Sequence, residues 1–219
     1  MVLSAGSVET TGTSPRTGTG RVLWLVRHGE STWNTLGKAQ GHRDQARLTA
    51  RGAGQAQTVA RRLQRRPIAA VYASDLRRAV DTAVPLASAL GLAVTRDTRL
   101  RERCLGVLEG TAAAAVSPAV SGVAASRVID PDARPDGGES IRDLYRRVAG
   151  FADDLVAGRL PGPAGRTGDV AIVAHGGTLR VLGAYLRGVP VEQMGWEPIA
   201  NGTISRWRVH QNPGDRENR

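Results

Sequence analysis

The chain is poor in cysteine, aromatic residues and lysine, and each scarcity limits what it can be. With one cysteine, Cys104, in 219 residues it has no intramolecular disulfide and no metal cluster built on several cysteines. Aromatic residues make up 4% of the chain, so leucine, valine, isoleucine and alanine must fill most of the core. There is no apolar run of about 18 residues, and the first twenty residues lack the basic start and apolar stretch of a secretory signal. We therefore expect a soluble, cytoplasmic protein with no membrane partner.

The charge is strongly positive and consists almost entirely of arginine. Thirty basic residues against twenty acidic ones give a net charge of +10, and Lys38 is the sole lysine. The arginines are scattered, and their densest cluster, within residues 61–66, falls on a predicted helix, where a run of charges is typical of a solvated face. No recognised nucleic-acid motif accompanies them. We therefore predict no nucleic-acid partner.

The length favours one α/β domain with a small insertion. Residues 1–20 are rich in serine, threonine and glycine and are predicted to be a disordered leader, and residues 210–219 a polar tail. Between them, residues 21–209 form the predicted catalytic domain, with an insertion at about 111–136. Residues 111–126 contain no charged side chain, which fits either a small helical insertion over the sheet or a loosely ordered lid.

Hydrophobic periodicity predicts alternating strands and helices. Short apolar runs typical of buried strands occur at 22–26, 68–73, 92–95 and 169–174, and an alternating run predicts an edge strand at 203–209. Helical spacing with capping residues occurs at 49–63, 76–90, 140–156 and 178–186, and 161–168 is predicted to be a flexible loop. This alternation predicts a three-layer α/β/α sandwich with a mostly parallel sheet, helices on both faces, and the insertion over the site.

Two predicted strands end in a histidine followed by a glycine, as His28-Gly29 and His175-Gly176. Ligands of open α/β sheets bind outside the carboxyl ends of the strands, and glycine lets a ligand approach the backbone closely. Taken alone, either histidine is explained equally well as a buried core residue whose hydrogen bonds are satisfied. Their matching positions favour a shared site instead.

Several motifs, in order along the chain, resemble one family. They are Arg27-His28-Gly29-Glu30-Ser31 with Asn34, Gln40-Gly41, Leu48-Thr49, Ser74-Asp75-Leu76-Arg77-Arg78-Ala79, Leu100-Arg101-Glu102, Leu108-Glu109-Gly110, Gly137-Gly138-Glu139-Ser140 and Ala174-His175-Gly176. This set resembles the histidine phosphatase (phosphoglycerate mutase-like) superfamily over roughly residues 21–209.

The resemblance implies a role for each matched position. His28 would be the nucleophile that forms a phosphohistidine, and Glu102 the proton donor to the leaving oxygen and then the base for water. The transferred phosphoryl group would be bound by Arg27, Arg77 and His175, with help from the Gly176 backbone. The substrate side would be lined by Asn34, Gln40 and Gly41.

Elementary chemistry agrees with these roles. Arginine presents a planar fork to phosphoryl oxygens and stays charged, and cationic neighbours would keep an imidazole neutral near pH 7. We therefore expect neither a metal ion nor a cofactor. Arg78 would point about 100° away from Arg77 on the helix and is predicted to be structural. Cys104 is assigned an inert packing role, and His42 and His210 are assigned to the surface.

The same residues would serve a hydrolase or a mutase. Mutases resembling this chain carry a tyrosine where Leu105 stands and several cations in the following insertion, whereas residues 111–126 are uncharged. We therefore predict a phosphatase acting on a small phosphorylated metabolite. The alternatives are a 2,3-bisphosphoglycerate-dependent phosphoglycerate mutase and a non-catalytic phosphate or nucleic-acid binder, which would have no need of Glu102. Whether the chain forms a homo-oligomer is left open.

Overall fold

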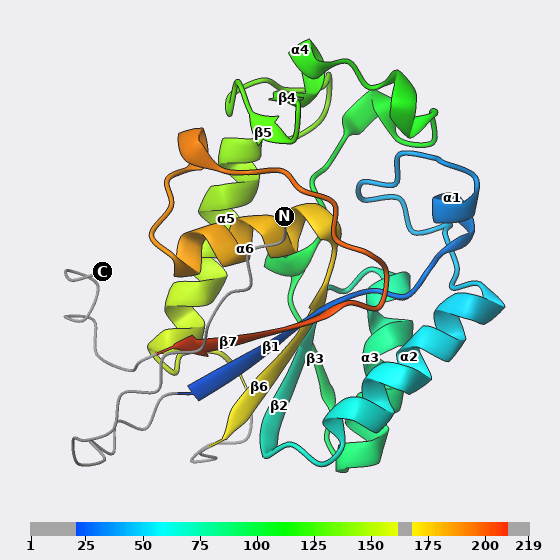
Figure 1. The fold of residues 1–219 in the computed structure, drawn as a ribbon, viewed down its shortest axis with the longest axis vertical. Coiled ribbons are helices and arrows are strands. Elements are labelled where there is room, and N and C mark those ends of the chain that lie inside the picture. Colours follow the sequence, from blue (N-terminus) through cyan, green and yellow to red (C-terminus); the bar gives the residue numbers. More distant parts are fainter. Residues whose placement is uncertain (1–20, 162–167, 210–219) are drawn as a thin grey trace, which may run out of the picture.

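A computed structural model describes residues 21–161 and 168–209 of the chain, and its centre is one twisted sheet (Figure 1). The sheet order is β3-β2-β6-β1-β7. The strands are β1 (Arg21–Arg27), β2 (Ile68–Ala73), β3 (Val94–Arg96), β6 (Asp169–Ala174) and β7 (Ile204–Val209). All are parallel except β7, which pairs antiparallel with β1 at the edge. The predicted mostly parallel sheet is confirmed.

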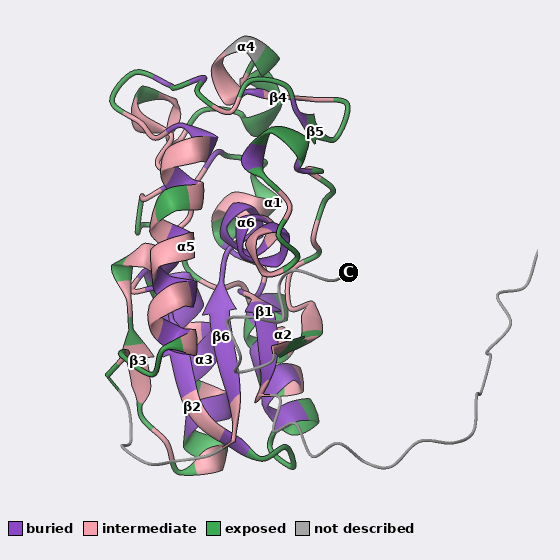
Figure 2. Cartoon of the chain, turned by 90° about the vertical axis from the view of Figure 1, so that its left-hand side faces the viewer, coloured by how far each residue is buried: buried purple, intermediate pink, exposed green. Residues whose placement is uncertain are grey.

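Helices cover both faces of this sheet, which confirms the predicted three-layer sandwich (Figure 1). One face carries α2 (Ala50–Leu63) and α3 (Arg77–Leu90), and the other carries α5 (Ile141–Val156) and α6 (Gly176–Leu186). Successive side chains of a strand point to opposite faces, so Trp24 packs with the α2–α3 side and Leu25 with the α5–α6 side. Because both faces are covered, β1 and β6 are buried along almost their whole length (Figure 2).

The helix boundaries follow local capping. Thr49 accepts a hydrogen bond from the Gly52 amide to begin α2, and Ser140 forms a capping box with Asp143 at the start of α5. Gly91 ends α3 in the left-handed conformation, as its position predicts. The start of α6 is the main difference, because the helix begins at Gly176, directly after His175, and not at the predicted 178.

The insertion lies beyond the carboxyl ends of the strands, at the top of Figure 2. The segment combines short helical turns with a small hairpin. Its elements are the 3₁₀ turn η3 (Ala113–Ala115), the helix α4 (Pro118–Ser121) and the strands β4 (Val123–Ala124) and β5 (Arg127–Val128), and the 3₁₀ turn η2 (Gly106–Leu108) precedes it. The remaining short elements are α1 (Thr32–Thr35), η1 (Thr98–Leu100) and η4 (Val191–Gln193).

Two glycines allow α2 to approach the end of β1. A Cβ atom on Gly29 would stand 2.4 Å from the Gly52 carbonyl oxygen, and one on Gly52 would stand 2.0 Å from that of Glu30. Neither position accepts a side chain, because both obstructing atoms belong to the backbone. This contact fixes the loop that follows β1 against the start of α2.

Three sequence expectations lie outside the described residues: the leader at 1–20, the tail at 210–219 with His210, and residues 162–167 of the predicted loop. Within 21–161 and 168–209, no helix is long and apolar enough to cross a membrane.

Candidate active site

The two histidines predicted at strand ends lie side by side. Strands β1 and β6 are neighbours, with Arg27 paired to Ala174, and the His28 amide donates to the Ala174 carbonyl at 3.0 Å. The rings of His28 and His175 are 5.1 Å apart between centroids, and both residues are buried. Parallel neighbouring strands thus bring together two residues that are far apart in the sequence.

The hydrogen bond of His28 fixes which ring nitrogen carries the proton. Its Nδ1 lies 2.7 Å from the carbonyl oxygen of Gly29, which can only accept, so Nδ1 is protonated and Nε2 keeps its lone pair. Burial, reinforced by the charges of Arg78 and Arg27, lowers the pKa of His28 well below its ordinary value. The imidazole is therefore neutral at pH 7 and has a nucleophilic nitrogen.

His175 is held in a matching way. Its Nε2 lies 2.9 Å from the hydroxyl oxygen of Ser74, at the end of the neighbouring strand β2. Burial, followed by the charge of Arg78, lowers the pKa of His175 well below its ordinary value. This ring is also neutral at pH 7. The Ser74 hydroxyl oxygen accepts from the Leu76 amide at 3.3 Å, so its proton can be donated to Nε2, which places the His175 proton on Nδ1.

The arginine from α3 that joins the histidines is Arg78, whereas the predicted Arg77 lies apart from them. Arg77 is more than half exposed, lies 4.0 Å from Asp81 and lines a separate surface hollow. The side chain of Arg78 is fully buried and donates to the carbonyls of Gly41 and Arg43 at 2.9 and 3.0 Å. The physical reason is the phase of the helix: α3 begins at Arg77, and the turn of about 100° to the next residue directs Arg78 inward.

Arg27 completes a cluster with unsatisfied polar atoms. Nη1 of Arg27 donates to the Ile199 carbonyl. Burial lowers the pKa of Arg27 and lowers the pKa of Arg78 to about 10, so both side chains stay charged at pH 7. Among the described residues, the buried side-chain polar atoms that lack a hydrogen-bond partner are Nε of Arg27, Nε of Arg78 and Nδ1 of His175. Buried polar groups are nearly always satisfied, so three orphans in one cluster indicate a ligand with several acceptor oxygens.

Glu102 faces this cluster from the loop after η1. Its Oε2 accepts from the Gly177 amide at 3.0 Å and its Oε1 from the Arg103 amide at 2.9 Å. The first of these amides belongs to the first turn of α6. A Cβ on residue 177 would stand 2.3 Å from Oε1 of Glu102, so a side chain there would displace the carboxylate.

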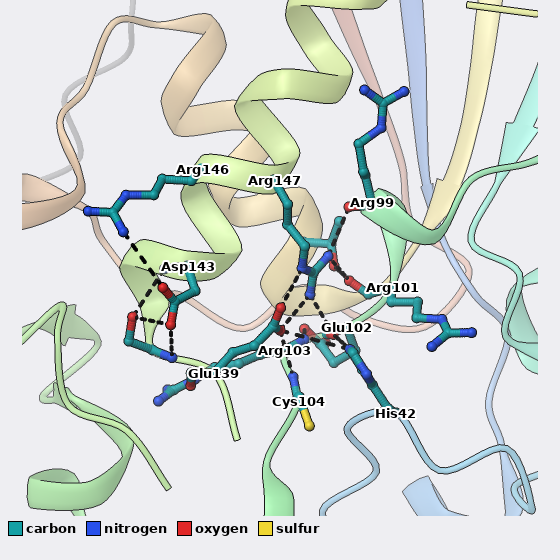
Figure 3. A network of polar contacts seen from close by, with 12 residues as sticks. His42, Arg99, Arg101, Glu102, Arg103, Cys104, Glu139, Asp143, Arg146 and Arg147 are labelled. Carbon is teal, nitrogen blue, oxygen red and sulfur yellow. Dashed lines mark hydrogen bonds and ion pairs between the residues drawn. The ribbon is translucent and has the colours of Figure 1, made fainter. Parts of the chain in front are cut away.

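A half-buried ion pair holds the backbone of the Glu102 loop (Figure 3). Arg147 of α5 donates to the Arg99, Arg101 and Glu102 carbonyls at 2.7–2.8 Å and pairs with both carboxylate oxygens of Glu139 at 2.8 Å. Glu139 in turn accepts from the Cys104 amide at 2.9 Å. His42, assigned to the surface from the sequence, is half-buried, and its Nε2 lies 2.8 Å from the Glu102 carbonyl. The loop is therefore fixed on both sides of Glu102.

Arg27, His28, Arg78 and Glu102 line a pocket of about 410 Å³, and His175 is not among the residues that line it. Gln40 and Gly41 line it, as predicted. Asn34 does not line it, which corrects its predicted place: its Oδ1 accepts from the Ser31 amide and from Asn201, so it caps α1. Gly176 lies at the first position of α6, and a Cβ there would be within 4 Å of both Arg27 and Arg180. The remaining lining residues include Arg103, Leu105, Ala113, Val116, Ser121, Val123, Gly177, Arg180 and Trp196.

Sequence reasoning missed the segment 195–202, which lies beside this pocket and contributes Trp196 to its lining. The Glu197 carbonyl accepts from Arg180, and the Asn201 side chain donates to the His28 carbonyl at 3.0 Å. The Gly202 amide donates to the Arg27 carbonyl at 3.1 Å. The sequence of this segment has no hydrophobic periodicity from which its position could have been predicted. Arg180 could have been predicted, because it follows Gly176 by about one helical turn and therefore lies on the same face of the helix.

Two further features bear on the chemistry of this region. Burial raises the pKa of the Cys104 thiol, which keeps it protonated and agrees with an inert role. Among residues 21–161 and 168–209, no three or more His, Cys, Asp or Glu side chains are grouped as metal ligands.

Comparisons with known proteins agree with this geometry. The sequence model of the histidine phosphatase superfamily, branch 1, matches residues 23–216. The chain is 38% identical to the glucosyl-3-phosphoglycerate phosphatase of Mycolicibacterium vanbaalenii, over 83% of this chain and 80% of the relative. It is 37% identical to the phosphoglycerate mutase-like protein 4 of Arabidopsis thaliana, over 84% of this chain and 78% of the relative. A mycobacterial glucosyl-3-phosphoglycerate phosphatase solved with VO3 is 34% identical, covers 85% of this chain and 90% of its own, and superposes with a TM-score of 0.72.

Proposed function

This chain belongs to branch 1 of the histidine phosphatase superfamily, and we propose that it hydrolyses phosphate monoesters through a phosphohistidine on His28, without a metal ion. One observation carries the proposal: the three unsatisfied buried nitrogens of Arg27, Arg78 and His175 gather around a neutral, buried histidine. A phosphoryl group supplies acceptor oxygens for such donors, and its transfer depends mainly on placement and charge stabilisation.

In the first step, Nε2 of His28 attacks phosphorus and the bond from phosphorus to the ester oxygen breaks. Glu102 gives its proton to that oxygen, so the alcohol leaves neutral. Arg27, Arg78 and His175 stabilise the negative charge on the three remaining oxygens, and the amides at the start of α6, Gly176 first, favour the same charge. The neutral ring of His28 needs no metal or base to make it nucleophilic.

In the second step, water attacks the phosphohistidine. The Glu102 carboxylate takes a proton from the water as the new phosphorus–oxygen bond forms and the phosphorus–nitrogen bond breaks. Inorganic phosphate leaves, and both His28 and Glu102 return to their starting protonation states. A mutase would use the same intermediate but pass the phosphoryl group to a bound phosphoglycerate.

The wall of the pocket favours the hydrolase. The part contributed by the insertion is uncharged, with Ala113, Val116 and Val123 beside Leu105. This surface offers little to hold a doubly anionic acceptor in place of water. The names of the relatives include both phosphatases and mutases, and glucosyl-3-phosphoglycerate is the first substrate to test.

The hydrolase proposal is tested by comparing two activities of one preparation. We expect release of inorganic phosphate from p-nitrophenyl phosphate and from glucosyl-3-phosphoglycerate, at rates that a chelator such as EDTA does not change. Interconversion of 2- and 3-phosphoglycerate, primed with 2,3-bisphosphoglycerate, should be slower than hydrolysis. Faster mutase turnover would assign the chain to the mutase alternative, and activity that is lost with EDTA and restored by a metal would contradict the metal-free chemistry.

The place of Glu102 is tested by Gly177→Ala. The new methyl group would occupy the space of the Glu102 carboxylate and displace it from the site. We expect kcat/KM for glycerol 3-phosphate to fall about 10²-fold, because an alkoxide leaves poorly without a proton donor. The loss for p-nitrophenyl phosphate should be clearly smaller, since nitrophenolate leaves readily unprotonated.

A matched control is Gly54→Ala, which also adds a methyl group to a helix, but in open space. It should leave both substrates unaffected. Equal losses for the two substrates in Gly177→Ala would show that the variant damages the site generally and would remove this support for Glu102 as the acid.

A further inference from the structure

Arg180 is a second cation at the pocket, outside the cluster around His28. It lies on α6, and its Nε donates to the Glu197 carbonyl while its guanidinium group stacks on Trp196, 5.0 Å from the ring centroid. These contacts fix the plane of the side chain without using its terminal nitrogens. Among the described residues, no group accepts a hydrogen bond from Nη1 or Nη2 of Arg180.

Arg180 lies beside the phosphoryl cluster. Burial lowers the pKa of Arg180, the charge of Glu102 raises it and the charge of Arg27 lowers it, so Arg180 is near both of these groups. Nη1 of Arg180 and Nε of Arg27 are 3.3 and 3.7 Å from one point, the Cβ position of Gly176. One small molecule can therefore contact both guanidinium groups.

Arg103, the other additional cation in the pocket wall, is already occupied. Its Nε, Nη1 and Nη2 donate to the carbonyls of Glu139, Ser121 and Ala133 at 2.6–2.9 Å. It therefore serves to hold the insertion in place. Arg180 is left as the cation whose two outer nitrogens remain available to a substrate.

We infer that Arg180 binds a carboxylate of the substrate, so that the enzyme prefers phosphate monoesters that carry a carboxylate close to the phosphate. The inference rests on the proposed function. A guanidinium with both terminal nitrogens available matches the two oxygens of a carboxylate, and one positive charge balances its single negative charge. A second phosphate dianion would need more cations than this part of the pocket supplies.

Two substrates that differ at one group test the inference. 3-Phosphoglycerate carries a carboxylate where glycerol 3-phosphate carries a hydroxymethyl group. We expect the wild type to prefer 3-phosphoglycerate in kcat/KM and Arg180→Gln to reduce that preference on the order of 10–100-fold, mainly through KM. Arg180→Lys, which keeps the charge but not the fork, should fall between the two.

Arg187→Gln is the matched control. Arg187 follows α6 directly and stacks on Trp207 at 5.2 Å, but it does not line the pocket, so its loss removes the same charge and the same kind of stacking. It should keep the wild-type preference. An equal loss of preference in both variants would attribute the effect to net charge and overturn the inference.

Two further measurements keep this result distinct from the proposed function. Orthovanadate resembles the phosphoryl group alone, so its inhibition constant should change less in Arg180→Gln than KM for 3-phosphoglycerate; an equal change would make Arg180 a phosphoryl ligand and overturn the inference. Binding of the two compounds to His28→Ala, with and without Arg180→Gln, can be measured by calorimetry and needs no turnover. Selective loss of 3-phosphoglycerate binding there supports the inference even if hydrolysis fails, and its absence overturns it.

Discussion

Replacing His28 with alanine should abolish phosphate monoester hydrolysis, with kcat/KM lower by about 10⁴–10⁶-fold. The loss is expected to be this large because the attacking nitrogen itself disappears while the donors that surround it remain. Hydrolysis of p-nitrophenyl phosphate measures the rate. Quenching the wild type in base after mixing with ³²P-labelled substrate should trap a protein-bound label that is stable in base and released in acid, as a phosphorus–nitrogen bond requires.

His28→Ala should carry no such label. The variant removes a buried ring, so its thermal unfolding must show a folded protein before the loss of rate is assigned to chemistry. A folded His28→Ala protein that still hydrolyses the ester, or still becomes labelled, would exclude His28 as the nucleophile.

The second large effect separates two adjacent arginines. Arg78→Gln should lower kcat/KM about 10²–10³-fold, comparable to the loss of one donor to a developing oxyanion, whereas Arg77→Gln should stay within about threefold of the wild type. The two variants remove the same charge from neighbouring positions of one helix. They differ because Arg78 is buried beside the histidines and Arg77 is exposed beside Asp81.

Arg78 also holds the carbonyls of Gly41 and Arg43, so its replacement can weaken the fold as well as the chemistry. Arg78→Lys retains the charge, and comparing rate with unfolding temperature across both variants separates the two effects. A rate per folded molecule near that of the wild type in Arg78→Gln, or a larger loss in Arg77→Gln, would return the role to Arg77.

The arginine pair shows how far the sequence could predict the site. The places of the two histidines were predictable, because each directly follows a buried strand and therefore lies at the carboxyl end of that strand. The arginine on α3 was not, because its direction depends on the residue at which the helix begins. Leu76 occupies the cap position of α3 without a side-chain cap, and Arg78, the second residue of the helix, is buried.

Asn34 and the segment 195–202 escaped prediction for a different reason. A short polar side chain can contact a ligand or cap a helix, and only the neighbouring backbone decides between these, here in favour of the cap. The segment 195–202 contributes mainly backbone carbonyls and amides, which every residue type possesses. Such backbone contacts cannot be predicted from a pattern of side chains.

The position of β1 within the sheet also determines when the site can exist during synthesis. The strand that carries the nucleophile is made first, yet its two partners, β6 and β7, and the segment 195–202 are the last parts of the domain to be made. A nascent chain that still holds residues 195–209 inside the ribosome can form neither β7 nor the contacts of Ile199 and Asn201 with Arg27 and His28. Contacts between such distant segments slow folding, so activity should arise only after the whole domain has emerged.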